Sequence, residues 1–261
     1  MKLFICPNGY TEEQNIQARQ CVCILEQKCG HSCSMGKEDS ICVFGDESKA
    51  CFGPEESDLV ISLGGDGSVL RAAKTALANE KPLMGINSGR LGYLCAISFS
   101  DLERFNELFD ELFLSQRHLL EVTSGEQKYI AVNDIVFAKR NVGSTVDLVI
   151  SVDDERELKM RGDGIIFSTA TGSTAYNLSA GGPMLSPDLD AFVMTPICPH
   201  SRQEYPVVLS ENHTVFVSEK YKEADIYVDG VFVDSLNEKA TVKKAGKTLQ
   251  LYTDKRILKA F

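Results

Sequence analysis

The chain has 261 residues, of which 43% are hydrophobic and 25% are charged, and its formal net charge at pH 7 is −10. This composition is typical of a soluble globular protein with one large domain or two modest ones. The acidic balance, without a block of Lys or Arg, argues against nucleic acid as the main partner. No apolar run approaches the length that spans a membrane, so we expect no membrane partner either.

Cysteine usage indicates a cytoplasmic protein with free thiols. The chain has nine cysteines, an odd number, and Met1–Pro7 predicts a first strand rather than a signal peptide. The Cys and His residues between Cys21 and Cys33 could suggest a zinc site. Their spacings do not form a paired Cys-x-x-Cys set, so we favour buried or half-buried free thiols.

The first part of the chain alternates predicted strands with predicted helices. We expect strands over 2–6, 41–44, 59–63 and 83–87, and helices over 11–29, 68–79 and 100–114. This alternation indicates a parallel sheet with right-handed crossovers. Open sheets of this kind bind ligands at the carboxyl ends of their strands. The Gly-rich segments 64–67 and 87–92 both follow predicted strands and are therefore candidate ligand loops.

The second part of the chain contains short β-rich runs and little helical periodicity. Predicted strands lie at 118–123, 128–138, 145–152, 164–169, 192–195, 214–218, 225–228, 231–233 and 248–252, with a hairpin turn at Asp229-Gly230. This pattern predicts a sandwich or a comparable all-β domain. We therefore expect an α/β domain over 1–115 that carries a phosphate-binding turn. A β-rich domain follows over 116–261, and its last residues could pack back on the first domain.

A glycine-rich turn follows the apolar run Leu59–Leu63. It contains Gly64, Gly65, Asp66 and Gly67, and a helical pattern starts directly after it. Backbone N–H groups and the positive end of a helix can face a phosphate at such a turn, and glycines let the backbone approach it. Asp66 would repel a phosphate unless it holds Mg²⁺ or takes a proton from a hydroxyl. The alternative is a turn in which Asp66 only supports the start of the helix.

The densest polar stretch of the chain runs from Arg161 to Pro183. It opens from the apolar run Ile165–Phe167 and then carries six small hydroxyl residues and Tyr176 between Ser168 and Ser179. Small hydroxyls and glycines suit close, hydrogen-bonded contact with a sugar or a phosphate. The alternative is a Ser/Thr-rich surface loop, but the stretch has few charged side chains for a freely solvated loop.

These motifs together resemble the NAD kinases of the small bacterial type. The matching segments, in family order, are Gly-Gly-Asp-Gly (64–67), Asn-Ser-Gly-Arg-Leu-Gly-Tyr-Leu (87–94), Val-Asn-Asp (132–134), Arg-Gly-Asp-Gly (161–164), Thr-Gly-Ser-Thr-Ala-Tyr (171–176), Leu-Ser-Ala-Gly-Gly-Pro (178–183), Thr-Pro-Ile-Cys-Pro-His-Ser (195–201) and Val-Asp-Gly (228–230). The resemblance implies an N-terminal α/β domain, a C-terminal β sandwich and a homotetramer or homodimer. It implies transfer of the γ-phosphoryl group of ATP to the 2′-hydroxyl of the adenosine ribose of NAD⁺, with a divalent metal, Mg²⁺ foremost. Some family members also accept polyphosphate.

The resemblance also assigns roles to individual residues. Asp66 matches the catalytic Asp of the family and is expected to act as the base, as a metal ligand, or as both. The remaining expected contacts with the nucleotides come from Gly64, Gly65, Gly67, Arg71, Asn133, Asp134, Arg161, Asp163, Thr171, Gly172, Ser173, Thr174, Ala175, Tyr176 and Ser179. Arg71 could instead be a surface arginine, and Arg161 with Asp163 a surface ion pair.

Four departures from the family pattern affect these expectations. Asp134 stands where the family more often has Glu, Val231 where a Gln is frequent, Ala170 where a Pro is common, and Glu204-Tyr205-Pro206 where Arg-Pro is frequent. Two other functions stay open at this point. Gly-Gly-Asp-Gly also occurs in diacylglycerol and sphingosine kinases, and a non-catalytic NAD(P)-binding sensor would keep the same pocket.

Overall fold

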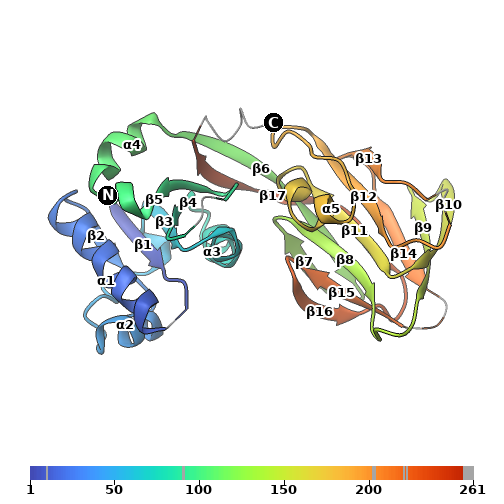
Figure 1. Ribbon diagram of the computed structural model, residues 1–261, viewed down its shortest axis with the longest axis horizontal. Coiled ribbons are helices and arrows are strands. Elements are labelled where there is room, and N and C mark those ends of the chain that lie inside the picture. Colours follow the sequence, from blue (N-terminus) through green and yellow to red (C-terminus); the bar gives the residue numbers. More distant parts are fainter. Residues whose placement is uncertain (10, 90–91, 202–203, 220, 222, 255–261) are drawn as a thin grey trace. The chain divides into compact units, whose positions relative to one another are not determined.

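The computed structural model describes residues 1–9, 11–89, 92–201, 204–219, 221 and 223–254 (Figure 1). The chain divides into two compact units. Unit 1 comprises Met1–Gln116 and Leu249–Phe261, and unit 2 comprises Arg117–Thr248. Each unit has its own hydrophobic core.

Unit 1 is an α/β domain with a parallel sheet, as the sequence predicts. Its strands are β1 (Lys2–Cys6), β2 (Ser32–Ser34), β3 (Leu59–Leu63), β4 (Leu83–Asn87) and β5 (Cys95–Ser98). They pair in parallel in the order β2-β1-β3-β4, β5 also pairs with β4, and Leu251 near the end of β17 (Ala240–Thr253) pairs with Leu83. Every residue of β3 and β4 is buried, which is typical of parallel strands covered on both faces.

The helices of unit 1 follow from local signals in the sequence. They are α1 (Glu12–Gln27), α2 (Lys37–Phe44), α3 (Asp66–Ala78) and α4 (Phe105–Glu111), with 3₁₀ turns η1 (Pro54–Glu56) and η2 (Phe99–Arg104). Thr11 caps α1 and forms a capping box with Gln14. α3 begins at Asp66, two residues earlier than predicted, so this carboxylate lies in the first turn of the helix.

Two predicted elements of unit 1 are wrong. The segment 41–44 is not a strand but the end of α2, because its short apolar run also suits a helix and Gly45 ends the helix in the left-handed conformation at φ 86°. The predicted helix 100–114 is instead η2 followed by α4. Leu112 then takes an extended conformation, and β6 (Phe113–Ser124) begins at the next residue. The three- and four-residue strands β2 and β5 were not predicted.

Unit 2 is an antiparallel β sandwich. One sheet has the order β13-β12-β11-β8-β15-β16, and the other contains β10-β9-β14-β17 with β6 and β7. The strands are β7 (Gln127–Ala131), β8 (Asp134–Lys139), β9 (Val146–Val152), β10 (Arg156–Gly162), β11 (Gly164–Thr169), β12 (Ala191–Ile197), β13 (Val207–Ser210), β14 (Val215–Glu219), β15 (Ala224–Val228) and β16 (Val231–Ser235). Unit 2 also contains a 3₁₀ turn η3 (Thr171–Thr174) and a short helix α5 (Tyr176–Ser179).

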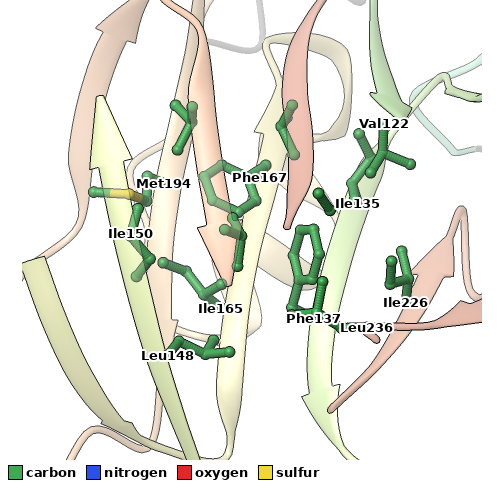
Figure 2. Close-up of a cluster of buried hydrophobic side chains, with 14 of the residues drawn as sticks. Val122, Ile135, Phe137, Leu148, Ile150, Ile165, Phe167, Met194, Ile226 and Leu236 are labelled. Atoms are coloured by element: carbon green, nitrogen blue, oxygen red, sulfur yellow. The ribbon is translucent and has the colours of Figure 1, made fainter. Parts of the chain in front are cut away.

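The core of unit 2 lies between these two sheets. Figure 2 shows side chains of both sheets in one cluster, including Leu148 and Ile150 of β9 and Ile165 and Phe167 of β11. Phe167 meets Phe137 of β8 edge to face, with ring centroids 5.8 Å apart. This packing fixes β8 and β11 side by side, so that the loops at their ends have a rigid support.

The sandwich differs from the predicted strands in several places. The predicted strand 128–138 is two strands, β7 and β8, interrupted at Val132 and Asn133. β10 and β13 were not predicted, and β17 starts well before the predicted segment 248–252. The predicted hairpin turn at Asp229-Gly230 is confirmed between β15 and β16. Among the helices of the described residues, none has the length and apolarity needed to cross a membrane.

Candidate active site

The glycine-rich turn of unit 1 joins β3 to α3 at the carboxyl end of the sheet. Gly64 has a φ of 138°, and a Cβ at this position would lie 2.3 Å from Ser68 Oγ, so only glycine fits. Positions 65 and 67 are different, because a Cβ at either would meet no described atom within 4 Å. The protein therefore leaves open space beside Gly65 and Gly67, at the start of a 13-residue helix.

The Asp66 carboxylate holds the second glycine-rich loop of unit 1. Its Oδ2 accepts the N–H of Tyr93 at 2.9 Å and its Oδ1 accepts the N–H of Leu94 at 3.0 Å. A Cβ at Gly92 would lie 2.3 Å from Oδ1, so the backbone can fold this closely over the carboxylate only at a glycine. Each oxygen of a carboxylate accepts about two hydrogen bonds. Asp66 thus retains capacity for a proton or a cation. The motif residues 90 and 91 lie outside the described residues.

Arg71 lies one turn further along α3 and points toward the end of β1. Its Nη2 donates to Asn8 Oδ1 at 2.5 Å and to Ser68 Oγ at 3.1 Å. Arg71 and Asn8 line an open pocket of about 520 Å³, together with Cys6, Asp39 and Thr75. Burial raises the pKa of the Cys6 thiol to about 12, so this thiol is neutral at physiological pH. The sequence indicated Arg71 but not Asn8.

In unit 2, Asn133 and Asp134 lie at the start of β8. Asp134 is only 5% exposed, and burial raises the pKa of its carboxyl to about 7, with the charge of Asp229 as a second cause. Neither side chain hydrogen-bonds to another part of the chain that the structure describes. A buried carboxyl without a partner is costly. An approaching ligand could supply the missing bonds.

The segment 171–179 packs directly against this pair. A Cβ at Gly172 would lie 2.1 Å from the carbonyl oxygen of Asn133, so the two backbones are in close contact. The Thr171 hydroxyl is buried and has no hydrogen-bond partner among the described residues. Tyr176 is 46% exposed, and partial burial raises the pKa of its phenol, with Cys198 as a further cause. Thr171 thus has an unused hydrogen-bonding group, and Tyr176 presents an exposed ring.

Other members of the predicted set have structural partners. The buried Ser173 hydroxyl donates to Ala170 O at 2.8 Å and accepts the N–H of Leu185 at 2.9 Å. In the described chain, these two hydrogen bonds hold the backbone of η3 in place. The carbonyl of Ser173 in turn accepts a bond from Asn177 Nδ2 at 2.9 Å. Thr174 and Ala175 are half-buried and Ser179 is exposed.

Arg161 and Asp163 each pair with a different residue. The Arg161 guanidinium forms two bonds of 2.6 Å with the carboxylate of Asp147 on β9. Asp163 accepts a 2.7 Å bond from Lys139 Nζ. The structure therefore does not bring the Arg161 and Asp163 side chains together as an ion pair.

The sequence did not indicate a role in the site for three residues of this region. Asn177 is fully buried, and its Oδ1 accepts a bond from Thr195 Oγ1 at 2.6 Å. Thr169 and Asp229 bind the backbone around Asn133. The sequence marks Asp229 as a turn residue within a family motif and Thr169 as one of several small hydroxyls, but it does not indicate these contacts, because contacts over long sequence separations leave no spacing signal.

Asp66 fits the requirements of a magnesium ligand. Mg²⁺ is usually held by one or two carboxylates together with substrate phosphates and water, and Asp66 offers a half-buried carboxylate beside open space. A second group of possible ligands in the described chain is His118, Asp190 and Glu211, whose ligand atoms lie within 4.8 Å of one another. Lys244 Nζ already lies 2.5 Å from Glu211 Oε1, so an ion-pair cluster explains that group.

Two family models match this chain, and they define its class. The ATP-NAD kinase N-terminal domain matches residues 8–117, and the ATP-NAD kinase C-terminal domain matches residues 132–252. The NAD kinase of Caldicellulosiruptor bescii is 43% identical over 182 residues, which are 69% of each chain. The NAD kinase of Lachnoclostridium phytofermentans is 31% identical over 271 residues, which cover 96% of this chain and 93% of the relative. The chain belongs to the NAD kinase family, so the resemblance of the motifs is confirmed.

Solved structures show the same fold. Yeast NADH kinase, in complex with NADH, superposes with a TM-score of 0.85 at 23% identity and covers 97% of this chain and 83% of that one. An NAD kinase from Archaeoglobus fulgidus, in complex with ATP, gives a TM-score of 0.78 at 22% identity and covers 100% of this chain and 96% of that one. The expected fold, an α/β domain followed by a β sandwich, is confirmed.

Proposed function

We propose that this protein is an NAD kinase that transfers the γ-phosphoryl group of ATP to the 2′-hydroxyl of the adenosine ribose of NAD⁺, giving NADP⁺ and ADP. The observation that carries the proposal is the match to a curated NAD kinase over 96% of this chain. The geometry supports it, because both glycine-rich regions present unused space or unpaired polar groups.

Unit 1 supplies the groups for phosphoryl transfer. Such a reaction needs phosphate binding, alignment and a base for the attacking hydroxyl. The open backbone at Gly65 and Gly67, at the positive end of α3, suits phosphate oxygens. Asp66 would take the proton of the 2′-hydroxyl and hold Mg²⁺. A bound Mg²⁺ would neutralise phosphate charge during transfer.

Unit 2 supplies the groups for the dinucleotide. Asn133 and Asp134 present an amide and a carboxyl side by side, which suits two adjacent ribose hydroxyls. Because the pKa of Asp134 is about 7, its carboxyl can donate or accept a hydrogen bond near neutral pH. The unpartnered Thr171 hydroxyl would make a further bond, and the exposed Tyr176 ring would stack on a base.

The cofactor, assembly and location belong to the same proposal. We infer that the enzyme uses Mg²⁺, forms a homodimer or homotetramer, and works in the cytoplasm without a nucleic-acid or membrane partner. Polyphosphate is a second candidate phosphoryl donor. The nine thiols agree with a reducing compartment, since none of them is in a disulfide.

A coupled assay tests the proposed function. Purified protein is incubated with NAD⁺, Mg²⁺ and ATP or polyphosphate, and NADP⁺ is measured with an NADP⁺-specific dehydrogenase. We expect NADP⁺ to form with ATP. Phosphorylation of diacylglycerol without NADP⁺ formation would favour a lipid kinase. Tight NADP⁺ binding without turnover under any donor or metal would favour a sensor.

A further inference from the structure

The backbone of residues 132–134, here called the 132–134 loop, interrupts what the sequence predicts as one continuous strand. Its three N–H groups all point to the carboxylate of Asp229. Val132 N donates to Oδ2 at 2.9 Å, while Asn133 N and Asp134 N donate to Oδ1 at 2.7 Å and 3.2 Å. Three consecutive amides that converge in this way form an anion-binding nest, and the protein fills it with its own carboxylate.

The turn that carries Asp229 is built to deliver this carboxylate. Asp229 and Gly230 have φ values of 49° and 77°, as a tight hairpin turn between β15 and β16 requires. The Asp229 N–H also donates to the Asp134 carbonyl at 3.0 Å, so backbone and side chain bind the same loop. The left-handed φ at Asp229 is uncommon for a residue other than glycine, although Asp and Asn tolerate it better than most.

Thr169 holds the carbonyl side of the same loop. Its hydroxyl donates to Val132 O at 2.7 Å, and its N–H donates to Asn133 O at 2.9 Å. The hydroxyl also accepts the N–H of Gly172 at 2.9 Å, which links the loop to η3. The donors and acceptors of the loop backbone are therefore bound from two sides, by β11 and by the β15–β16 turn.

We propose that Asp229 and Thr169 are positioning residues of the nucleotide site, which fix the 132–134 loop so that Asn133 and Asp134 face the ligand. This inference rests on the proposed function of the 132–134 loop in binding NAD⁺. The carboxyl of Asp134 is buried yet unpartnered in the described chain, and Asn133 has no side-chain partner there either. A backbone held by six hydrogen bonds to two residues, beside two uncommitted polar side chains, is the arrangement expected of a preorganised binding loop.

The first test measures amide hydrogen exchange in the 132–134 loop and does not depend on enzyme activity. Asp229→Asn suits it, because Asn-Gly is a favoured sequence for this turn and the hairpin should be kept. The amide offers one acceptor atom instead of two, and its NH₂ faces an N–H of the loop. We expect amide hydrogen exchange in the 132–134 loop to become at least about tenfold faster, with the rest of β8 and all of β15 unchanged.

Asp153→Asn is the matched control. Asp153 also has a left-handed φ, of 52°, and its carboxylate accepts the N–H of Thr214 at 2.8 Å, but it does not contact the 132–134 loop. We expect this variant to leave exchange in that loop unchanged. Unchanged exchange in Asp229→Asn as well would overturn the inference.

The second test measures NAD⁺ use. Asp229→Asn should raise the KM for NAD⁺ about tenfold or more while kcat falls less. Thr169→Val should do the same, and Thr169→Ser, which keeps the hydroxyl, should restore most of the loss. A KM within about twofold of wild type in both Asp229→Asn and Thr169→Val would refute a positioning role.

The pH profile separates positioning from a general loss of structure. Two titratable groups face Asp134: Asp229, which lies in the β15–β16 turn, and Tyr176, which lies in α5. Removing the Asp229 charge should move the inflection of the KM for NAD⁺ to lower pH, whereas Thr169→Val, which keeps that charge, should leave it closer to the wild-type value. If wild type makes no NADP⁺ but the exchange changes occur as expected, the proposed function fails and the loop support stands.

Discussion

Asp66→Asn is the most informative substitution, because Asp66 holds a loop in the structure and has a separate, catalytic task in the proposed mechanism. Its two oxygens accept the N–H groups of Tyr93 and Leu94. An amide can turn its oxygen to only one of these donors, and its NH₂ then faces the other. A hydrogen bond to a charged group contributes about 1.5–3 kcal/mol, so we expect a local loss of about 2 kcal/mol. That loss corresponds to about 30-fold faster amide exchange at these two residues.

The effect on catalysis should be larger. Removing a general base typically lowers the rate by about 10²–10⁴-fold, and loss of a magnesium ligand would add to this. We expect NADP⁺ formation to fall at least about 100-fold, measured in the coupled assay at saturating substrates. The exchange experiment on the same sample reports how far the loop has opened.

Asp58→Asn is the matched control for this experiment. Asp58 precedes β3, whereas Asp66 follows it, and its Oδ2 accepts the N–H of Lys2 at 2.7 Å. In the control the amide oxygen can still accept this single N–H, so the change tests loss of charge without loss of the hydrogen bond, and the activity should be unchanged. If Asp66→Asn turns over as fast as wild type, Asp66 is neither the base nor a metal ligand. If exchange at Tyr93 and Leu94 is unchanged, the loop contact is refuted.

Three further predictions concern unit 2. Gly172→Ala places a methyl group 2.1 Å from Asn133 O, and we expect urea unfolding to show a loss of about 1–3 kcal/mol with weaker NAD⁺ binding. Because the folded-state pKa of Asp134 is raised to about 7 from 3.8, the folded protein binds this proton more tightly, and wild type should lose up to about 4 kcal/mol between pH 4 and 7. Asp134→Asn should lack this pH dependence in the same measurement. Arg161→Ala removes an exposed pair with Asp147 and should cost less than about 1 kcal/mol. An unchanged KM for NAD⁺ would then remove Arg161 from the site.

The sequence predicted the parts of the fold that carry a strong local signal. β3, β4 and β11 have the predicted bounds, because each is a short apolar run enclosed by turn residues. The segment 41–44 misled the prediction, since a four-residue apolar run suits a strand and a helix equally. β10 was missed because its charged edge-strand sequence shows only a weak apolar alternation.

The sequence indicates candidate site residues but not the contacts that support them. Glycines and hydroxyls in two dense stretches indicate ligand loops by composition alone. Asp66 binds amides 27 and 28 residues away, and Asp229 binds amides 95 to 97 residues away. Contacts between a side chain and a distant backbone group leave no periodicity or spacing in the sequence, so only the folded chain shows them.

The pairing of β17 has a consequence for the order in which the protein can fold during synthesis. Leu251 pairs with Leu83 of β4, and its carbonyl accepts a 2.9 Å bond from Ser115 Oγ, so a strand of unit 1 comes from the end of the chain. A ribosome would release all of residues 117–248 before this strand emerges. Until then β4 is bordered by β3 and β5, and only its first residue, Leu83, lacks the pairing that Leu251 supplies, while the sandwich has its whole sequence available first. Such an interval exposes backbone donors and acceptors to wrong partners, and a chaperone or slow translation would matter most there.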